Sequence, residues 1–236
     1  MKIDTTHRSE AEELMDDFAM EGEILSDALD KIASINKLLG GNNVTLNGVI
    51  ELTKGLPRNT LIKILDVGCG NGDMLRMLAD YGNTHCYNFM LVGVDANAFT
   101  IKYAENLTSN YSNISYQCKD ICINPITDNY DIILCTLTLH HFKDKEIIGL
   151  IKIFYQQSKL GIVINDLHRS KIAYYLFKLI CWVFALNDMS RDDGLVSILR
   201  GFKKSDLLNY AQQLNLKQFS IRWKWAFRYQ WIIKSI

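Results

Sequence analysis

The chain has 236 residues, of which 48% are hydrophobic and only two are proline. It is therefore long and apolar enough to bury one large core, which excludes a disordered chain. Its 26 acidic residues balance 26 basic ones, and this balance argues against the basic composition typical of nucleic-acid-binding proteins.

Charge is unevenly distributed along the chain. Residues 1–30 carry ten acidic and two basic residues, whereas residues 199–236 carry eight basic residues and one acidic residue. The two ends are interpreted as complementary solvated surfaces that pack near each other. A site for an acidic ligand or a membrane headgroup at the basic end is the alternative.

Six cysteines are scattered along the chain without a CxxC pair or a zinc-finger spacing. We interpret them as reduced thiols of a cytoplasmic protein, and we expect no metal site. The first residues, "MKIDTTHRSEAEELMDD", contain no apolar stretch of the kind found in a signal peptide.

The first 58 residues are predicted to form a helical cap. Ser9 and Glu12 match a capping box, which predicts a helix over residues 9–19. A second helix begins near residue 24 and ends at "LLGG", where Gly40 or Gly41 can adopt the left-handed conformation.

Short strand-like runs alternate with helical runs from residue 59 onward. This alternation predicts an α/β fold with a doubly wound, mostly parallel sheet. The predicted strands are 61–68, 89–95, 114–118, 130–137 and 160–167, and the predicted helices between them are 72–82, 98–107 and 144–158.

The sheet pattern is interrupted over residues 167–202. This insertion contains "IAYYLFKLICWVFAL", residues 172–186, which is short for a membrane span and includes Lys178. It is interpreted as a lid over a site, a core helix or a helix that contacts a membrane surface. A helix at 204–215 and two consecutive strands, 216–227 and 228–236, then predict an antiparallel edge.

The first strand leads into a glycine-rich loop, "LDVGCGNGD" at residues 65–73. A phosphate-binding loop requires GxxxxGK[ST], which is absent here. A dinucleotide fingerprint requires GxGxxG, and Asp73 stands where the third glycine belongs. The first hypothesis fails because its motif is absent. The second is disfavoured because a carboxylate repels a pyrophosphate.

Two further acidic residues follow the next two strands. Asp95 ends the strand at 89–95, where a carboxylate can accept hydrogen bonds from both ribose hydroxyls. Asp120 follows the strand at 114–118 and can accept a hydrogen bond from an adenine amine, with Ile121 against the ring. Together with the glycine loop they predict a nucleoside site.

The motifs "ILDVGCGNGD", "LVGVDAN", "KDI" and "DIILCTLTLHHF" resemble those of class I S-adenosylmethionine-dependent methyltransferases over residues 60–236. The resemblance implies a seven-stranded sheet with the last strand antiparallel, and S-adenosylmethionine as the cofactor. The implied cofactor-binding residues are Asp66, Gly68, Cys69, Gly70 and Gly72 at the methionine part, Asp95 and Ala96 at the ribose, Asp120 and Ile121 at the adenine, and Cys135, Thr136 and Leu137 at the sulfonium.

The "LHHF" motif is closest to small-molecule members of this family that modify quinones and aromatic polyketides. We therefore expect methyl transfer to a small aromatic or lipophilic acceptor, at a phenolic or enolic oxygen. Transfer to carbon, a nicotinamide-dependent oxidoreductase and a non-catalytic scaffold are the alternatives. With two prolines in the chain, the [DNS]PP[YFW] motif of nucleic-acid amino-methylating enzymes is absent.

Proton removal from a phenol calls for a base, and histidine has a suitable pKa. His141 and His168 follow the fourth and fifth strands and are the candidate bases, while His140 is interpreted as structural. Histidines of the pocket wall with no proton-transfer role are the alternative. Candidate acceptor-binding residues in the insertion are Tyr174, Tyr175, Arg191 and Arg200.

Overall fold

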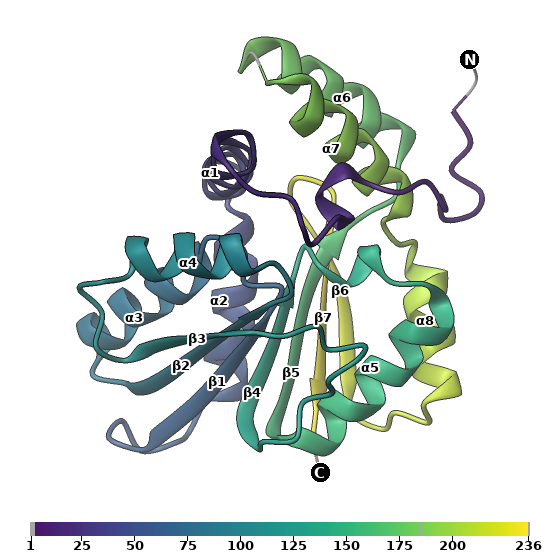
Figure 1. Cartoon of the computed structure of the whole chain (residues 1–236). Helices are drawn as coiled ribbons and strands as arrows, with labels where there is room; N and C mark the ends of the chain where they lie inside the picture. Colours follow the sequence, from purple (N-terminus) through teal and green to yellow (C-terminus); the bar gives the residue numbers. More distant parts are fainter. Residues whose placement is uncertain (1–2, 185, 236) are drawn as a thin grey trace.

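The computed structural model describes residues 3–184 and 186–235. Residue 185 of the predicted apolar helix, residue 236 of the predicted last strand and residues 1–2 of the predicted cap lie outside this part of the chain. Figure 1 shows a central sheet, which the helices cover on both faces.

The sheet has seven strands in the order β3-β2-β1-β4-β5-β7-β6. They are β1 (Leu61–Val67), β2 (Asn88–Asp95), β3 (Ile114–Cys118), β4 (Tyr130–Thr136), β5 (Ser158–Leu167), β6 (Phe219–Lys224) and β7 (Arg228–Lys234). Strands β1 to β5 pair in parallel, and β7 is antiparallel to both β5 and β6. The predicted doubly wound, mostly parallel fold is confirmed; the antiparallel strand lies one place inside the edge.

Eight helices are assigned among the described residues. They are α1 (Glu23–Leu38), α2 (Gly41–Leu52), α3 (Asp73–His85), α4 (Ala98–Leu107), α5 (Asp144–Gln157), α6 (Lys171–Val183), α7 (Asp188–Arg200) and α8 (Lys204–Gln213). Helices α2, α3 and α4 contribute to the core on one face of the sheet. Helices α5 and α8 contribute to the core on the other face.

The first predicted helix, over residues 9–19, is wrong. Only Leu14–Asp16 form a short 3-10 turn there, and the flanking residues are irregular. Distant partners take the hydrogen bonds that a helix would make: the backbone N–H groups of Leu14 and Met15 donate to Asp193 of α7, at 2.8 and 3.0 Å. Tertiary contacts therefore override the local capping signal.

Helix α2 was not predicted from the sequence, and it packs on the sheet beside β5 and β7. Its close approach depends on Gly48, since a Cβ at this position would lie 2.5 Å from Cγ1 of Val163. Docking of α2 fixes the turn between α1 and α2, where Gly40 has the left-handed conformation expected of a helix end.

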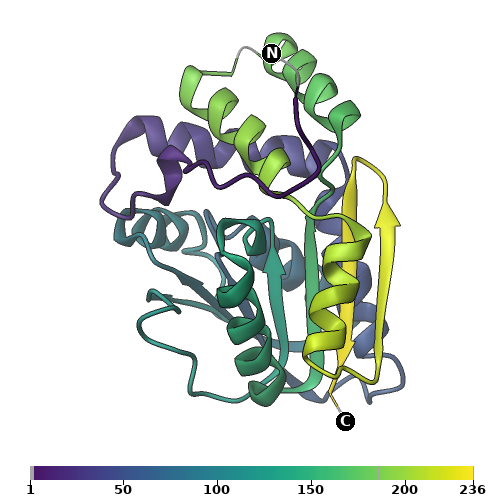
Figure 2. The same ribbon diagram turned by 90° about the vertical axis from the view of Figure 1, so that its right-hand side faces the viewer.

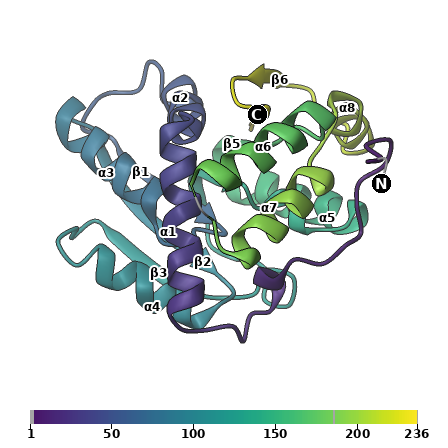
Figure 3. The ribbon, with the colours of Figure 1, turned by 90° about the horizontal axis from the view of Figure 1, so that it is seen from above.

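Helices α1, α6 and α7 lie above the carboxyl ends of the parallel strands (Figures 1 and 2). Seen from above, α1 runs beside α6 and α7 across this end of the molecule (Figure 3). The insertion predicted at residues 167–202 thus forms two helices next to the N-terminal ones. None of the described helices has the length and apolar character that a membrane crossing requires.

Two helical glycines provide a matched test of how α2 packs. Gly48→Ala is expected to lower the free energy of unfolding by about 1–3 kcal/mol, because the new methyl group overpacks against Val163. Gly149→Ala in α5 is expected to raise it by up to ~1 kcal/mol, since a Cβ there meets open space and alanine favours a helix. Urea unfolding of both variants checks this; equal effects would contradict the packing of α2.

Candidate functional site

A cavity of about 1950 Å³ lies at the carboxyl end of the parallel strands. The glycine loop and the ends of β2, β4 and β5 form its floor, and residues of the N-terminal segment, α1, α6 and α7 border it as well. In an open α/β sheet this is the usual location of a ligand.

The glycine loop turns tightly where β1 meets α3. Gly68 and Gly72 have φ of 68° and 76°, a region that favours glycine. A Cβ on Gly68 would lie 2.3 Å from Cγ2 of Thr138, and one on Gly72 would lie 2.1 Å from Oη of Tyr116. Gly68 thus lets the loop backbone approach the cavity, and Gly72 makes room for Tyr116 at the start of α3.

Three carboxylates surround the loop and make it electrostatically negative. Burial raises the pKa of Asp66 well above its usual range, and the charges of Asp73 and Asp95 add to this effect. Within the described residues, Oδ1 of Asp66 is buried without a hydrogen-bond partner. Such a site fits a cationic group and repels a pyrophosphate.

Asp95 is held in place by the loop that it faces. Its two carboxylate oxygens accept hydrogen bonds from the backbone N–H groups of Gly70 and Asn97, both at 3.1 Å. Burial still raises its pKa. Farther along, Oδ1 of Asp120 accepts from the N–H of Cys122 at 2.8 Å, and Ile121 is buried beside it at the cavity.

Helix α1 and the segment before it are fastened to these loops. Asp30 accepts hydrogen bonds from Nδ2 of Asn71 at 3.0 Å and from the hydroxyl of Tyr103 at 2.6 Å. Nδ2 of Asn97 donates to the carbonyl oxygen of Met20 at 2.7 Å. These contacts close the cavity over the ends of β1 and β2.

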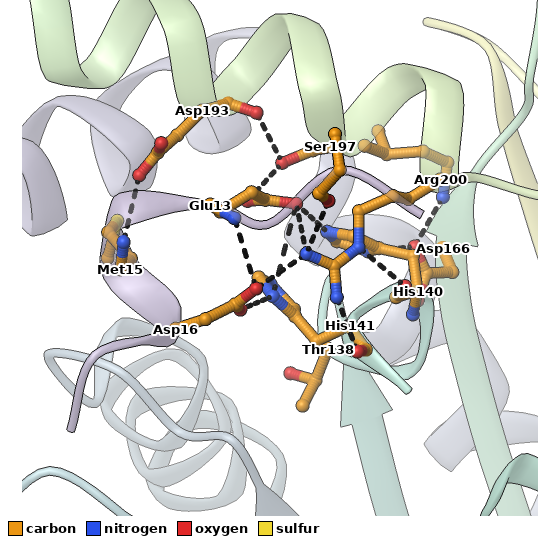
Figure 4. Close-up of polar contacts among 12 residues, drawn as sticks. Glu13, Met15, Asp16, Thr138, His140, His141, Asp166, Asp193, Ser197 and Arg200 are labelled. Atoms are coloured by element: carbon orange, nitrogen blue, oxygen red, sulfur yellow. Dashed lines mark hydrogen bonds and ion pairs between the residues drawn. The ribbon is translucent and has the colours of Figure 1, made fainter. Parts of the chain in front are cut away.

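His140, just after β4, is oriented by Asp166 of β5 (Figure 4). Its Nδ1 lies 2.7 Å from Oδ1 of Asp166, and its backbone N–H donates to Oδ2 at 3.1 Å. Burial alone would raise the pKa of Asp166, but the contacts with His140 lower it, so it remains a carboxylate. We assign the imidazole proton to Nδ1, because a carboxylate can only accept, which leaves a lone pair on Nε2.

The N-terminal segment covers this histidine pair. Oε1 of Glu13 lies 3.9 Å from Nε2 of His140, and neither atom has a hydrogen-bond partner in the described part of the chain. Oδ1 of Asp16 lies 2.6 Å from Nδ1 of His141. Nη1 of Arg200 donates to Oδ2 of Asp16 at 2.6 Å, so charges from both ends of the chain meet here (Figure 4).

Glu13, His140 and His141 also have the composition of a metal site, with ligand atoms within 4.8 Å of one another. The guanidinium of Arg200 already lies 3.5 Å from Oε1 of Glu13 and supplies a positive charge there. Burial raises the pKa of Glu13, while the hydrogen bond from Ser197 and the charges of His141 and Arg200 oppose this rise.

His168 lies farther along the same edge, at the end of β5. Its Nδ1 accepts a hydrogen bond from Nε1 of Trp223 at 3.2 Å, and its ring contacts Tyr229 edge-on with centroids 5.1 Å apart. Burial lowers its pKa, and the charges of Arg169 and Lys203 add to this. The ring is therefore neutral near neutral pH, and it borders the cavity.

Comparison with known sequences gives two kinds of match. Residues 64–161 match a family model described as a methyltransferase domain. The ubiquinone biosynthesis O-methyltransferase of Coxiella burnetii (strain RSA 331 / Henzerling II) is 35% identical over 162 residues, which cover 67% of this chain and 64% of that protein. The corresponding protein of Glaesserella parasuis serovar 5 is 29% identical over 160 residues, covering 64% and 63%.

Solved structures with the same fold include two methyltransferases. The plantazolicin methyltransferase BpumL in complex with SAH has a TM-score of 0.66 and 17% identity, covering 90% of this chain and 89% of that one. Magnesium protoporphyrin IX methyltransferase (ChlM) from Synechocystis PCC 6803 with bound SAH has a TM-score of 0.57 and 15% identity, covering 84% of both chains.

Residues 64–161 are thus a methyltransferase domain, and the fold is that of the class I S-adenosylmethionine-dependent methyltransferases. The chain spans less than two thirds of the length of the ubiquinone biosynthesis relatives that it matches, 64% for the protein of Coxiella burnetii. The negative glycine loop fits the cofactor of this family, because S-adenosylmethionine carries an ammonium and a sulfonium and no phosphate. The unpaired Oδ1 of Asp66 is suited to an ammonium group.

Most of the predicted cofactor-binding residues of the methyltransferase border the cavity. They are Asp66, Gly68, Cys69, Gly70, Asp95, Ala96, Asp120, Ile121, Thr136 and Leu137. Leu137 has a φ of 53°, a costly conformation for a side chain of this size. Its N–H donates to the carbonyl of Asn165 at 2.9 Å, which places the chain after β4 at the cavity.

Two predicted cofactor-binding residues lie elsewhere. Cys135 is fully buried in the core behind β4, because alternation along the strand turns its side chain away from the cavity. Gly72 forms the N-cap of α3, where its role is to give space to Tyr116. All six cysteines are free thiols.

The structure also corrects three of the predicted acceptor-binding residues. Tyr174 and Tyr175 belong to α6 but lie outside the cavity lining, and Tyr175 is exposed. Arg191 is engaged with Asp188 and Asp192, both at 2.9 Å. The sequence does not fix the rotation of α6 about its axis, so it could not show which side chains border the cavity. The structure places Leu176, Phe177 and Ile180 at the cavity.

Sequence reasoning missed Glu13, Asp166 and Arg228, which all border the cavity or hold its histidines. Asp166 stands near the end of β5 in "INDLH", as Asp95 stands at the end of β2, and this strand-end position could have indicated it. Nothing in the sequence pattern connects Glu13 with residue 140, because the contact spans most of the chain.

The first test of the site is the affinity for the methyl donor. Asp95→Asn is expected to weaken S-adenosylmethionine binding by about 10- to 100-fold, since a charged hydrogen bond is worth roughly 1.5–3 kcal/mol. Isothermal titration calorimetry measures this, with Asp128→Asn in an exposed loop as the matched control. Unchanged affinity in a folded Asp95→Asn variant would contradict the assigned site.

Proposed function

We propose that the chain transfers a methyl group from S-adenosylmethionine to a hydroxyl oxygen of a small aromatic or lipophilic acceptor, with His140 as the base. The observation that carries the proposal is the pair of His140 and Asp166 at the end of β4 and β5. The ubiquinone relatives, named as O-methyltransferases, support oxygen as the atom that is methylated.

Bound S-adenosylmethionine supplies an electrophilic methyl group on a good leaving group. The protein then has to orient the acceptor and accept its proton, and orientation alone can contribute about 7–11 kcal/mol. Asp166 holds the proton on Nδ1 of His140, so Nε2 is free to accept the hydroxyl proton as the acceptor oxygen bonds to the methyl carbon.

Glu13 is placed to orient the same hydroxyl. Its Oε1 and Nε2 of His140 are 3.9 Å apart, too far for a direct hydrogen bond. Burial favours the protonated form of Glu13 by raising its pKa, and a protonated Oε1 can donate to the acceptor oxygen while that oxygen gives its own hydrogen to Nε2. An acceptor oxygen about 2.8 Å from each atom would fit between them, with an angle of roughly 90° at that oxygen. Glu13 would then be a positioning residue and His140 the base.

The cavity wall beside these residues suits a lipophilic acceptor. Several apolar side chains of the insertion border it: Ala173, Leu176, Phe177, Leu179, Ile180, Leu186 and Ile198. Elsewhere on α6, Ile172, Trp182 and Val183 are 62–80% exposed. Helix α6 therefore has too few buried residues for a core helix, which supports its interpretation as a lid.

The alternatives differ from this proposal in measurable ways. Transfer to carbon would use the same fold and cofactor site but yield a product without a new methyl ether. A nicotinamide-dependent oxidoreductase is disfavoured, because its pyrophosphate would lie against Asp66 and Asp73. A non-catalytic scaffold would bind the cofactor and turn over none of the acceptors.

The test compares His140, His141 and His168 in assays with a panel of catechols and other phenols. His140→Gln and Asp166→Asn are expected to lower kcat by about 10²–10⁴-fold while S-adenosylmethionine affinity is retained. His141→Gln and His168→Gln, the sequence-derived candidates, are expected to keep most of the rate. Mass spectrometry and NMR of the product identify the methylated atom.

A full loss of rate in His141→Gln or His168→Gln, with His140→Gln active, would reassign the base. Absence of turnover by the wild-type protein with every acceptor, despite cofactor binding, would instead favour the scaffold.

A further inference from the structure

Arg228 is a buried arginine at the acceptor side of the cavity. It is the first residue of β7, where it pairs with Leu167 at the end of β5, one residue beyond Asp166. Its residue exposure is 4%, and it borders the cavity. Its guanidinium carbon approaches the turn between α1 and α2, since a Cβ on Gly41 would lie 2.9 Å from it.

The guanidinium of Arg228 makes no hydrogen bond or ion pair with the described residues. Both Nε and Nη1 are buried without a hydrogen bond. The neighbouring Oδ1 of Asn36, 1.9 Å from the same Cβ position on Gly41, is buried and unpaired too. A charged group left in this state costs several kcal/mol unless a ligand completes its contacts.

The other two buried arginines of the protein are fully engaged. Arg169 donates to the carbonyl of Gly201 at 2.5 Å and pairs with Asp206 at 3.0 Å. Arg200 donates to the carbonyls of the two adjacent histidines and pairs with Asp16 at 2.6 Å. The fold thus satisfies buried guanidinium groups elsewhere, and Arg228 differs from them.

Asp166, the carboxylate whose charge acts on Arg228, already has hydrogen-bond partners on both oxygens. Asp166 uses Oδ1 for Nδ1 of His140 and the N–H of Leu167, and Oδ2 for the N–H of His140. Burial lowers the pKa of Arg228 to about 10, and the charge of Asp166 opposes this shift. Since this value is well above neutral pH, Arg228 is a cation that faces the cavity.

We propose that Arg228 is a carboxylate receptor that binds an acidic group of a ligand in this cavity. A planar carboxylate matches the two parallel N–H groups of a guanidinium, which gives a strong bidentate pair. This inference rests on the proposed function, which supplies two ligands for the cavity. The carboxylate belongs either to an acceptor that is itself an acid or to the methionine part of the cofactor.

The sheet order favours the acceptor as the source. Strand β7 is three places from β1, at about 4.8 Å for each place, so the start of β7 lies roughly 14 Å from the start of the glycine loop. It lies next to β5, which carries Asp166, the partner of the proposed base. If Arg228 bound an acidic substituent of the acceptor, the rest of the acceptor would therefore lie near His140.

The test uses Arg228→Met, with Arg222→Met as the matched control. Arg222 is a partly exposed arginine of β6 that pairs with Glu51 outside this cavity. In the absence of ligand, Arg228→Met is expected to melt at the same temperature as the wild-type protein or higher, because an unpaired buried charge is removed. A clear loss of stability would show that Arg228 is structural, and would overturn the proposal.

Ligand titrations then identify the source of the carboxylate. For the acceptor arm, hydroxybenzoates are compared with the corresponding phenols, and Arg228→Met is expected to lose about 10- to 100-fold in affinity for the acids alone. For the cofactor arm, S-adenosylmethionine is compared with decarboxylated S-adenosylmethionine. A loss confined to the carboxylated cofactor assigns Arg228 to the methionine part.

If Arg228→Met binds both acids and S-adenosylmethionine as the wild-type protein does, the proposal is wrong. The proposed function fails separately, when the wild-type protein neither binds S-adenosylmethionine nor methylates any phenol.

Discussion

The site depends on carboxylates that the sheet places at its carboxyl edge, away from bulk water. Asp66 and Asp166 lie at the ends of β1 and β5 and are 2% and 1% exposed. Asp95 is the last residue of β2, the strand next to β1. A buried carboxylate is costly unless a donor or a cation meets it. The partner of each carboxylate therefore decides which ligands the cavity can bind.

The three carboxylates differ in their hydrogen-bond partners. Asp166 is satisfied within the protein, by His140 and two backbone N–H groups, and in return it fixes the imidazole proton. Asp95 receives two backbone N–H groups and still has a raised pKa. Asp66 retains an unpaired oxygen among the described residues. In the proposed reaction the internal pair orients the base, and the unsatisfied carboxylate favours a cationic ligand.

The opposite charges at the two ends of the chain also meet at this site. Glu13 and Asp16 of the acidic N-terminal segment contact Arg200, the first basic residue of the C-terminal region. The two ends thus pack near each other as expected, but the contact is buried and not a solvated surface: Glu13 and Arg200 are 6% and 8% exposed. This contact keeps the N-terminal segment over the histidines, although that segment has little regular structure of its own.

The sequence predicted what local signals determine. Residues 98–107 and 114–118 were predicted with the bounds that α4 and β3 have, because apolar periodicity and strand-forming residues coincide there. The cavity-facing acids after β2 and β3 were predicted from their positions at strand ends. Such features depend on neighbours within a few residues.

Contacts between distant residues could not be predicted in the same way. Helix α2 has a weakly amphipathic sequence, and its packing depends on the fit between Gly48 and Val163. The expected helix over residues 9–19 is absent because Asp193 binds the N–H groups of Leu14 and Met15. The contact of His140 with Asp166 was not predicted, because Asp166 is 26 residues away on another strand.

The central claim is that buried carboxylates at the glycine loop select a cationic nucleoside. A calorimetric comparison of S-adenosylmethionine, SAH and NAD with the wild-type protein tests it most directly. The account predicts binding of the first two with a Kd on the order of micromolar, and no measurable heat with NAD. Tighter binding of NAD than of S-adenosylmethionine would contradict it.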